Sequence, residues 1–170
     1  LNSTRSNKTM KPKSHRFRSL AIASGALLSI SYAHAQSGTW NVDANGLWSL
    51  DTNWLGNTIA TGSGSTASFT NDITDDRTVG LDSDRTLTSL VFGDSATGTA
   101  GSWIIDNNAV SDNNLILAGT TPGITVNALG TGKTATISAM IEGSSLVKSG
   151  TGTLILSGAN SYTGLTTVSA

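Results

Sequence analysis

Short apolar runs separated by polar, glycine-containing gaps make up most of the chain after residue 65. Leu115–Leu117 and Leu154–Leu156 are typical runs, and nearly every gap contains Gly, Asn, Asp, Ser or Thr. Beyond residue 36, no window keeps apolar residues at the i, i+3, i+4, i+7 spacing of an amphipathic helix for three turns. Runs that recur roughly every 8 to 13 residues are typical of short strands joined by turns. The pattern predicts an all-β chain.

Repetition within the chain favours a β-solenoid over a sandwich or a barrel. The stretch "LILAGTTPGITVNA", residues 115–128, aligns with the later stretch "LILSGANSYTGLTTVSA", residues 154–170. Both run from L-I-L through a polar turn ending in Gly to T-V-x-A, although two similar hairpins would show the same likeness by chance. Each solenoid strand buries only one or two side chains, so three-residue runs suffice. We predict solenoid rungs over residues 65–145 and treat the two stretches as equivalent units.

Three tryptophans stand close together in "GTWNVDANGLWSLDTNWLGN", among Asn, Asp and Gly turn formers. Such spacing is typical of short strands joined by turns, with Trp40, Trp48 and Trp54 covering one end of a thin core. We therefore predict a Trp-rich N-terminal cap over residues 36–64, because the terminal unit of a solenoid must differ from its inner rungs. In the alternative interpretation the three indoles are exposed and form a glycan-binding face.

Residues 10–35 have the three parts of a secretory signal peptide in order. Met10 is the expected start, "KPKSHRFR" is basic, and the apolar run at residues 20–32 leads to "AHA". The small residues Ala33 and Ala35 predict cleavage before Gln36, although a short buried helix with a chance A-x-A would share the pattern. The run is too short to span a bilayer, so no membrane span is predicted. Residues 1–9 are expected to be upstream read-through or the edge of a fragment.

Charge is divided unevenly between this leader and the rest of the chain. Six Lys and Arg and no acid precede residue 36, whereas four Lys and Arg and all eleven acids follow it. An acidic body without a basic stripe argues against a nucleic-acid partner. The chain has no Cys, and both histidines, His15 and His34, lie in the leader. Ser-His-Asp and Cys-His catalysis and His- or Cys-ligated zinc are therefore excluded, and no cofactor or metal is predicted.

The acids suggest one enzymatic alternative. In "NDITDDR", Asp75 and Asp76 stand directly before Arg77, a set that would suit a polysaccharide-degrading β-helix in which acids hold calcium beside a basic residue. However, no calcium-loop spacing such as D-x-D-x-D-G occurs, and Asp commonly ends strands and accepts hydrogen bonds from turn N–H groups. The expected role of these residues is structural, and the chain is predicted not to be an enzyme.

The stretch "LVKSGTGTLILSGANSYTGLTTVSA", residues 146–170, closely resembles the autotransporter-associated β-strand repeat, also called the passenger-associated transport repeat. The family pattern runs roughly L-x-K-x-G-x-G-T-L-x-L-S-G-x-N-x-Y-x-G-x-T-x-V, and Leu165 departs from it where a second Gly is common. The matching residues after Leu146 are Lys148, Gly150, Gly152, Thr153, Leu154, Leu156, Ser157, Gly158, Asn160, Tyr162, Gly164 and Val168, with Thr166 or Thr167 between the last two. The stretches at residues 40–56 and 87–93 also resemble the opening segments of such proteins.

The resemblance implies a secreted or surface-displayed protein whose passenger is a right-handed parallel β-helix, with the repeat aiding export and folding. This chain would be the N-terminal piece of such a passenger, located at the outer membrane, at the cell surface or outside the cell. The expected function is structural and non-enzymatic. The expected partners are the outer-membrane translocation machinery or cell-surface glycans, and adhesion through the tryptophans remains an alternative.

Overall fold

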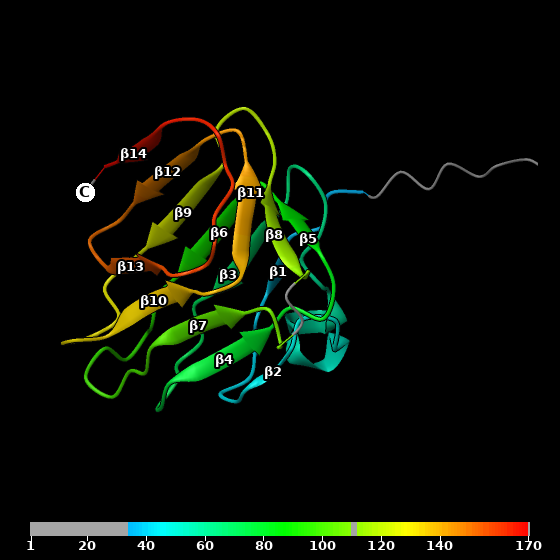
Figure 1. Cartoon of the computed structure of the whole chain (residues 1–170). Coiled ribbons are helices and arrows are strands. Elements are labelled where there is room, and N and C mark those ends of the chain that lie inside the picture. The colour runs from blue at the N-terminus through cyan, green and yellow to red at the C-terminus, as the bar shows by residue number, and fades with distance from the viewer. Residues whose placement is uncertain (1–33, 110–111, 170) are drawn as a thin grey trace, which may run out of the picture. The chain divides into compact units, whose positions relative to one another are not determined.

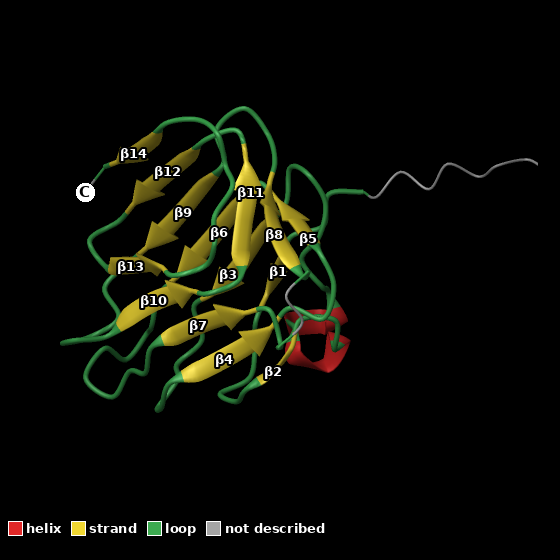
Figure 2. Ribbon diagram, viewed as in Figure 1, coloured by secondary structure: helices red, strands yellow, loops and turns green. Residues whose placement is uncertain are grey.

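The computed structural model describes residues 34–109 and 112–169, which form three parallel β-sheets (Figures 1 and 2). The first 33 residues, including most of the predicted signal peptide and Ala33 of its cleavage site, lie outside the described residues. The six-stranded sheet contains, in spatial order, β1 (Gly38–Thr39), β3 (Thr66–Phe69), β6 (Ser89–Phe92), β9 (Gly123–Val126), β12 (Leu146–Ser149) and β14 (Thr166–Val168).

The other two sheets are smaller. The five-stranded sheet contains β2 (Gly46–Leu47), β4 (Arg77–Gly80), β7 (Trp103–Asp106), β10 (Thr134–Ile137) and β13 (Thr153–Leu156). The three-stranded sheet contains β5 (Arg85–Leu87), β8 (Asn114–Leu117) and β11 (Met140–Gly143). Two single-turn 3₁₀ helices, Asp51–Asn53 and Leu55–Asn57, follow β2.

From β3 to β11 the chain visits the three sheets in a fixed order: six-stranded, five-stranded, three-stranded, and back to the first. The first and last circuits, β1–β2 and β12–β13, place no strand in the three-stranded sheet. Each strand pairs in parallel with the strand that occupies the same sheet one circuit earlier, as Ser89 of β6 pairs with Gly123 of β9. This winding is a parallel β-helix, and it confirms the predicted fold class. Circuits differ in length because their turns differ: the circuit from Ser89 to Gly123 is longer than the one from Leu146 of β12 to its partner Thr166.

Stacking of equivalent positions builds the core. Side chains alternate across a strand, so a four-residue strand directs two of them inward, as Ile124 and Val126 do in β9. The register then places inward residues of successive circuits in columns, such as Ala67, Leu90 and Ile124, all of which are buried. Two inward residues per strand are enough for a continuous core, and for this reason very short apolar runs specify the fold.

The expected equivalence of residues 115–128 and 154–170 is wrong in its first half. Leu115–Leu117 lies in β8 of the three-stranded sheet, whereas Leu154–Leu156 lies in β13 of the five-stranded sheet. The partner of β13 is β10, with Thr134 opposite Thr153. An apolar triplet satisfies the inward-outward alternation of any of the three sheets, so the local pattern does not reveal which sheet it joins.

The three N-terminal tryptophans form a buried aromatic cluster. Trp40, Trp48 and Trp54 are all buried, with ring centroids of Trp54 lying 5.4 Å from Trp40 and 5.0 Å from Trp48. Phe69 of β3 packs against the same rings. Each indole N–H donates to a backbone carbonyl, as Trp48 Nε1 does to the Ala60 oxygen at 3.0 Å. The glycan-binding interpretation of these residues is therefore wrong, since none of the rings offers a face to a sugar.

The segment around these tryptophans closes the N-terminal end of the solenoid. Residues 54–61 return antiparallel to β1, with bridges from Trp40 to Trp54 and from Gln36 to Thr61. The side chain of Asn53 covers β2 by donating from Nδ2 to the Leu47 oxygen at 3.1 Å. At Gly38 a Cβ atom would lie under 3.0 Å from backbone atoms of the returning segment, so only glycine permits this approach. The edges of β1 and β2 are thus protected from pairing with another chain.

Candidate functional site

The opposite end of the solenoid is open, and residues 146–169 build it. Strands β13 and β14 stand at the outer edges of their sheets, close to the C-terminus in Figure 1. Leu165 and Val168 are 82% and 68% exposed. Between the two edge strands lies a hollow of about 300 Å³ whose lining includes Leu146, Lys148, Leu154, Leu156 and Val168. Apolar side chains of the last described circuit therefore line this hollow.

Four glycines of the repeat lie directly on the backbone of the preceding circuit. A Cβ atom at Gly150, Gly152, Gly158 or Gly164 would lie under 3.0 Å from a backbone oxygen, namely those of Val126, Asn127, Ala139 and Ser144, respectively. Gly150 also has a φ of +77°, a conformation that residues with a Cβ rarely adopt. The glycines of the pattern are therefore needed for close stacking of one circuit on the next.

Asn160 joins the last circuit to the three-stranded sheet. Its Oδ1 accepts a hydrogen bond of 2.9 Å from the N–H of Ile141 in β11, in place of the carbonyl of a further strand. The N–H groups of Ser161 and Thr163 continue the pairing by donating to the oxygens of Ile141 and Gly143. An amide side chain in a turn thus continues the ladder of β11.

Replacing Asn160 by Ala should lower the free energy of unfolding by about 1 kcal/mol, because the N–H of buried Ile141 loses its acceptor. Asn160→Asp retains an acceptor oxygen and should cost less. Urea unfolding followed by circular dichroism measures both variants. Equal losses for the Ala and Asp variants would show that the hydrogen bond to Ile141 is not what the asparagine contributes.

The remaining residues of the pattern also contact the preceding circuit or the core. Leu154, Leu156 and Tyr162 are half-buried against the core, and the Tyr162 hydroxyl accepts a hydrogen bond of 3.1 Å from Thr166 Oγ1. Lys148 occupies the inward position paired with Ile124, and its ammonium donates to the Gly150 oxygen. The other matching residues pair in register or by backbone bonds: Thr153 with Thr134, Ser157 with Ile137, and Val168 with Lys148.

Asp76 and Arg77, two residues of the enzymatic alternative, stand at the start of β4, and their side chains contact other circuits. Arg77 Nε bonds Asp43 Oδ1 of the preceding circuit at 2.6 Å. Asp76 Oδ1 accepts from the N–H of Ser102 at 2.8 Å and from Lys133 Nζ at 3.1 Å, both in later circuits. In the part of the chain that the structure describes, no group of three or more His, Cys, Asp or Glu is placed to hold a metal ion. These charged side chains connect successive circuits.

The same contacts make the N-terminal circuits sensitive to acid. The hydrogen bond from Arg77 lowers the pKa of Asp43 below its ordinary value of 3.8, and the N–H of Ser102 lowers the pKa of Asp76 likewise. Each carboxylate therefore contributes stability that is fully present above the unfolded pKa of about 3.9 and is lost as pH falls through the lower folded pKa. We expect the urea midpoint to fall as the pH is lowered below about 5, and Asp43→Asn to reduce that fall. Asp72→Asn, which removes an exposed carboxylate outside these contacts, is the matched control for the loss of one negative charge.

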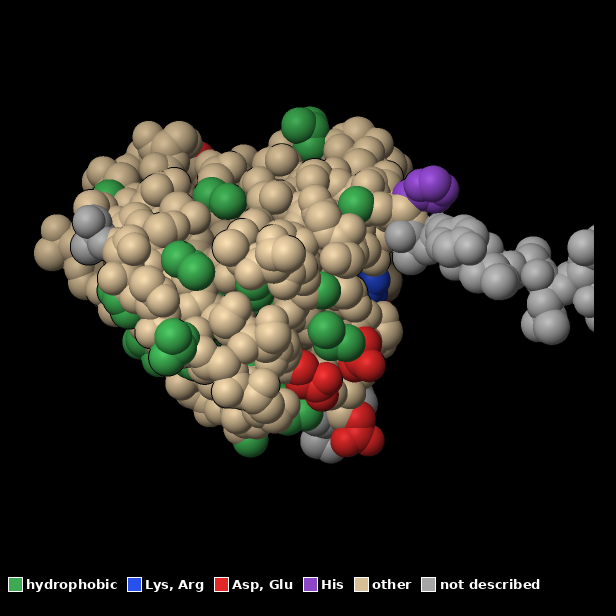
Figure 3. All heavy atoms as spheres, turned by 90° about the horizontal axis from the view of Figure 1, so that it is seen from above, with side chains coloured by type: hydrophobic (Ala, Val, Ile, Leu, Met, Phe, Trp, Pro, Cys, Tyr) green, Lys and Arg blue, Asp and Glu red, His purple; other side chains and the backbone are tan. Residues whose placement is uncertain are grey.

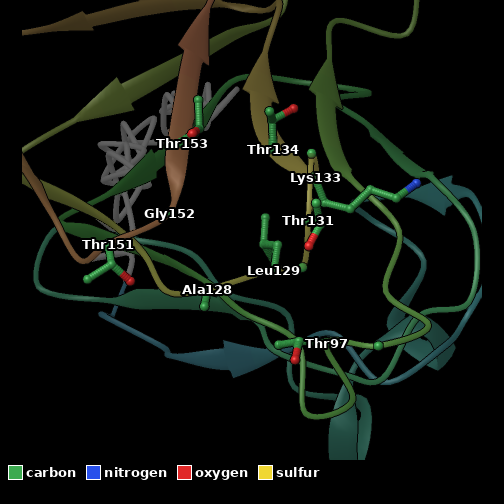
Figure 4. Close-up of a pocket in the computed structure, with 12 residues that line it drawn as sticks. Thr97, Ala128, Leu129, Thr131, Lys133, Thr134, Thr151, Gly152 and Thr153 are labelled. Carbon is green, nitrogen blue, oxygen red and sulfur yellow. The ribbon is translucent and has the colours of Figure 1, made fainter.

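A larger hollow, of about 580 Å³, lies at the corner between the six- and five-stranded sheets (Figure 4). It arises because the turn at residues 127–133 is longer than the turn at 150–152 in the next circuit. Thr97, Thr131, Thr151 and Thr153 are among its lining residues, and Lys133 extends away from Leu129 at its centre. The difference in turn length thus leaves a hollow at the surface, and its lining residues do not form a cluster of charged groups.

Together these features define a class, a parallel β-solenoid whose N-terminal circuits are covered by their own returning segment. Residues 146–170, of which 146–169 are described in the structure, match the family model described as passenger-associated-transport-repeat. The match confirms the resemblance seen in the sequence and indicates a passenger-associated role in an exported protein of the autotransporter type. No curated protein and no solved structure matches the chain. The described part of the chain contains no helix with the length and apolar character needed to cross a membrane.

Proposed function

We propose that this chain is a non-enzymatic structural part of an exported β-solenoid passenger, and that its repeat presents the end on which following circuits stack. One observation supports this proposal most directly. The glycines of the repeat and Asn160 contact the preceding circuit, whereas the repeat's own strands, β13 and β14, lie at the edges of their sheets. Because the N-terminal end is closed, the solenoid has a direction, and new circuits would add only at the open end.

Stacking on a preformed end would aid folding for two physical reasons. A following circuit would find unpaired N–H and C=O groups already in register along β13 and β14, so it would not have to form a new sheet. It would also cover exposed apolar side chains such as Leu165 and Val168, and full burial of such a residue contributes about 1.5–3 kcal/mol. A repeat whose edge strands can pair with a following circuit is therefore suited to help a longer passenger fold.

The predicted leader supports export, and the repeat supports display at the cell surface or release from it. The translocation machinery of the outer membrane is the partner that such a route would require. A non-enzymatic role is supported by Asp76 and Arg77, whose charged groups are engaged with other circuits.

Extending the full chain by a second copy of residues 146–170 should raise its melting temperature and increase amide hydrogen-exchange protection in β13 and β14. The reason is that the added circuit pairs with both edge strands and covers the hollow at the open end. An extension of identical composition but scrambled order is the control and should change neither quantity. If the two extended chains behave alike, the open end does not serve as a template for stacking.

A further inference from the structure

A third hollow, of about 440 Å³, lies across the first three circuits at the outer side of the five-stranded sheet, where β2, β4 and β7 lie side by side (Figure 1). Its volume falls in the range of small-molecule sites. The lining consists of Gly46 together with Asn45, Leu47, Thr78, Gly80, Asp106 and Asn108. This hollow is remote in sequence from the repeat and does not depend on the open end.

A glycine occupies the middle of the row of outward positions beneath the hollow. Gly80 pairs with Leu47 on one side and with Asp106 on the other, so the row lacks a side chain at its centre. A Cβ atom at Gly80 would lie 3.1 Å from the Cβ of Asn108 and 3.2 Å from its Oδ1. The amide of Asn108 therefore lies over the position where a side chain of residue 80 would begin.

Asn108 is held in this position by its backbone. Its φ is +52°, a left-handed conformation that Asn tolerates better than most residues. Its N–H donates to Asp106 Oδ1 at 2.9 Å. Across the hollow, Asn45 Oδ1 accepts from the N–H of Thr78 at 2.8 Å, so its NH₂ group is the part of the amide left for a ligand. Two amides and a carboxylate, from the first and third circuits, thus line the hollow.

This set of groups suits an uncharged sugar. Planar amides and a carboxylate supply paired donors and acceptors for neighbouring hydroxyls, and Leu47, which is 40% exposed, supplies an apolar surface for a C–H face. None of the described residues that line the hollow is Lys or Arg. Asp106, together with the excess of acids in the chain, would repel an anionic ligand. Figure 3 shows another face of the molecule, on which Asp and Glu side chains also gather on one side of a largely uncharged surface.

We propose that this hollow binds an uncharged oligosaccharide. The site differs from the tryptophan cluster to which the sequence pointed, since the indoles are buried whereas this hollow is open to solvent. A glycan, one of the two partner classes expected from the sequence, is retained in this proposal, but its contacts lie on the outer side of the first three circuits.

Calorimetric titration of the full chain tests the proposal with six-unit oligosaccharides of glucose, mannose, galactose, xylose and N-acetylglucosamine, and with hexagalacturonate as the anionic probe. We expect saturable binding of at least one uncharged probe and none of hexagalacturonate. Asn108→Gly should weaken binding about tenfold, the effect of losing one hydrogen-bonding group. Glycine accepts the left-handed backbone at residue 108, so the fold is retained.

Asn57→Gly is the matched control. Asn57 also has a left-handed backbone, with a φ of +56°, and its amide bonds Asp51 outside the hollow. This variant should bind like the unaltered chain, and the melting temperatures of both variants should stay close to that of the unaltered chain. The proposal is overturned if no uncharged probe binds, if hexagalacturonate binds more tightly, or if the two glycine variants bind alike.

Discussion

Replacing Trp48 by Ala should destabilise the closed end of the solenoid by about 3–5 kcal/mol, the usual cost of removing a buried aromatic side chain from a core. Trp48 is fully buried, and its ring lies 5.0 Å from that of Trp54 and 5.4 Å from that of Phe69. The substitution opens a cavity among these rings and leaves the Ala60 oxygen without its indole donor. Urea unfolding followed by tryptophan fluorescence and circular dichroism measures the loss.

Leu55→Ala is the control for this substitution. Leu55 lies in the same segment but is 58% exposed, so its truncation should change stability by no more than about 0.5 kcal/mol. A Trp48→Ala protein as stable as the Leu55→Ala protein would mean that the indoles do not hold the closed end together. A structural role for the cluster would then have to be abandoned.

Replacing Gly158 by Ala should detach the last circuit from the solenoid. A Cβ atom at this position would lie under 3.0 Å from the carbonyl oxygens of Ala139 and Ser138. These are backbone atoms of the preceding circuit, so relief requires the two circuits to separate, at a cost of about 1–3 kcal/mol. Amide hydrogen exchange should show lost protection in β13 and β14 but retained protection in β3 and β6.

Gly98→Ala is the matched control for the repeat glycine. A Cβ atom at Gly98 would meet nothing within 4 Å, so this variant should exchange like the unaltered chain. Unchanged protection of β13 and β14 in Gly158→Ala would contradict the conclusion that the repeat's glycines are required for stacking. Reduced protection in both variants would point to a general effect of losing glycine rather than to this contact.

The fold class was accessible from the sequence because a solenoid is specified locally. Each strand needs only two inward side chains, as in β9, and each turn needs Gly, Asn, Asp, Ser or Thr, so the pattern of short runs is sufficient evidence. The repeat was equally accessible, since its matching residues stand at fixed spacings within the single stretch 146–170. The contacts that explain the pattern, such as Asn160 with Ile141, became visible only with the structure.

Two features could not be decided from the sequence because they depend on long-range arrangement. The spacing of Trp40, Trp48 and Trp54 is the same whether the rings face solvent or one another, and burial was decided by Phe69 and the returning segment at residues 54–61. The hollow over Gly80 escaped the sequence because its lining comes from three circuits, with Asn45 and Asn108 far apart along the chain. No spacing rule connects such residues, because turn lengths vary from circuit to circuit.

The sequence alone determined that the chain is all-β, that it winds as a solenoid, and that residues 146–170 form a passenger-associated transport repeat. These properties follow from alternation, turn chemistry and short-range motif spacing, which are local. The tertiary structure alone decided which sheet each strand joins, which end is closed, and which side chains meet across circuits. Those properties depend on register between strands of successive circuits, and register is set by the lengths of the intervening turns and by packing in the shared core.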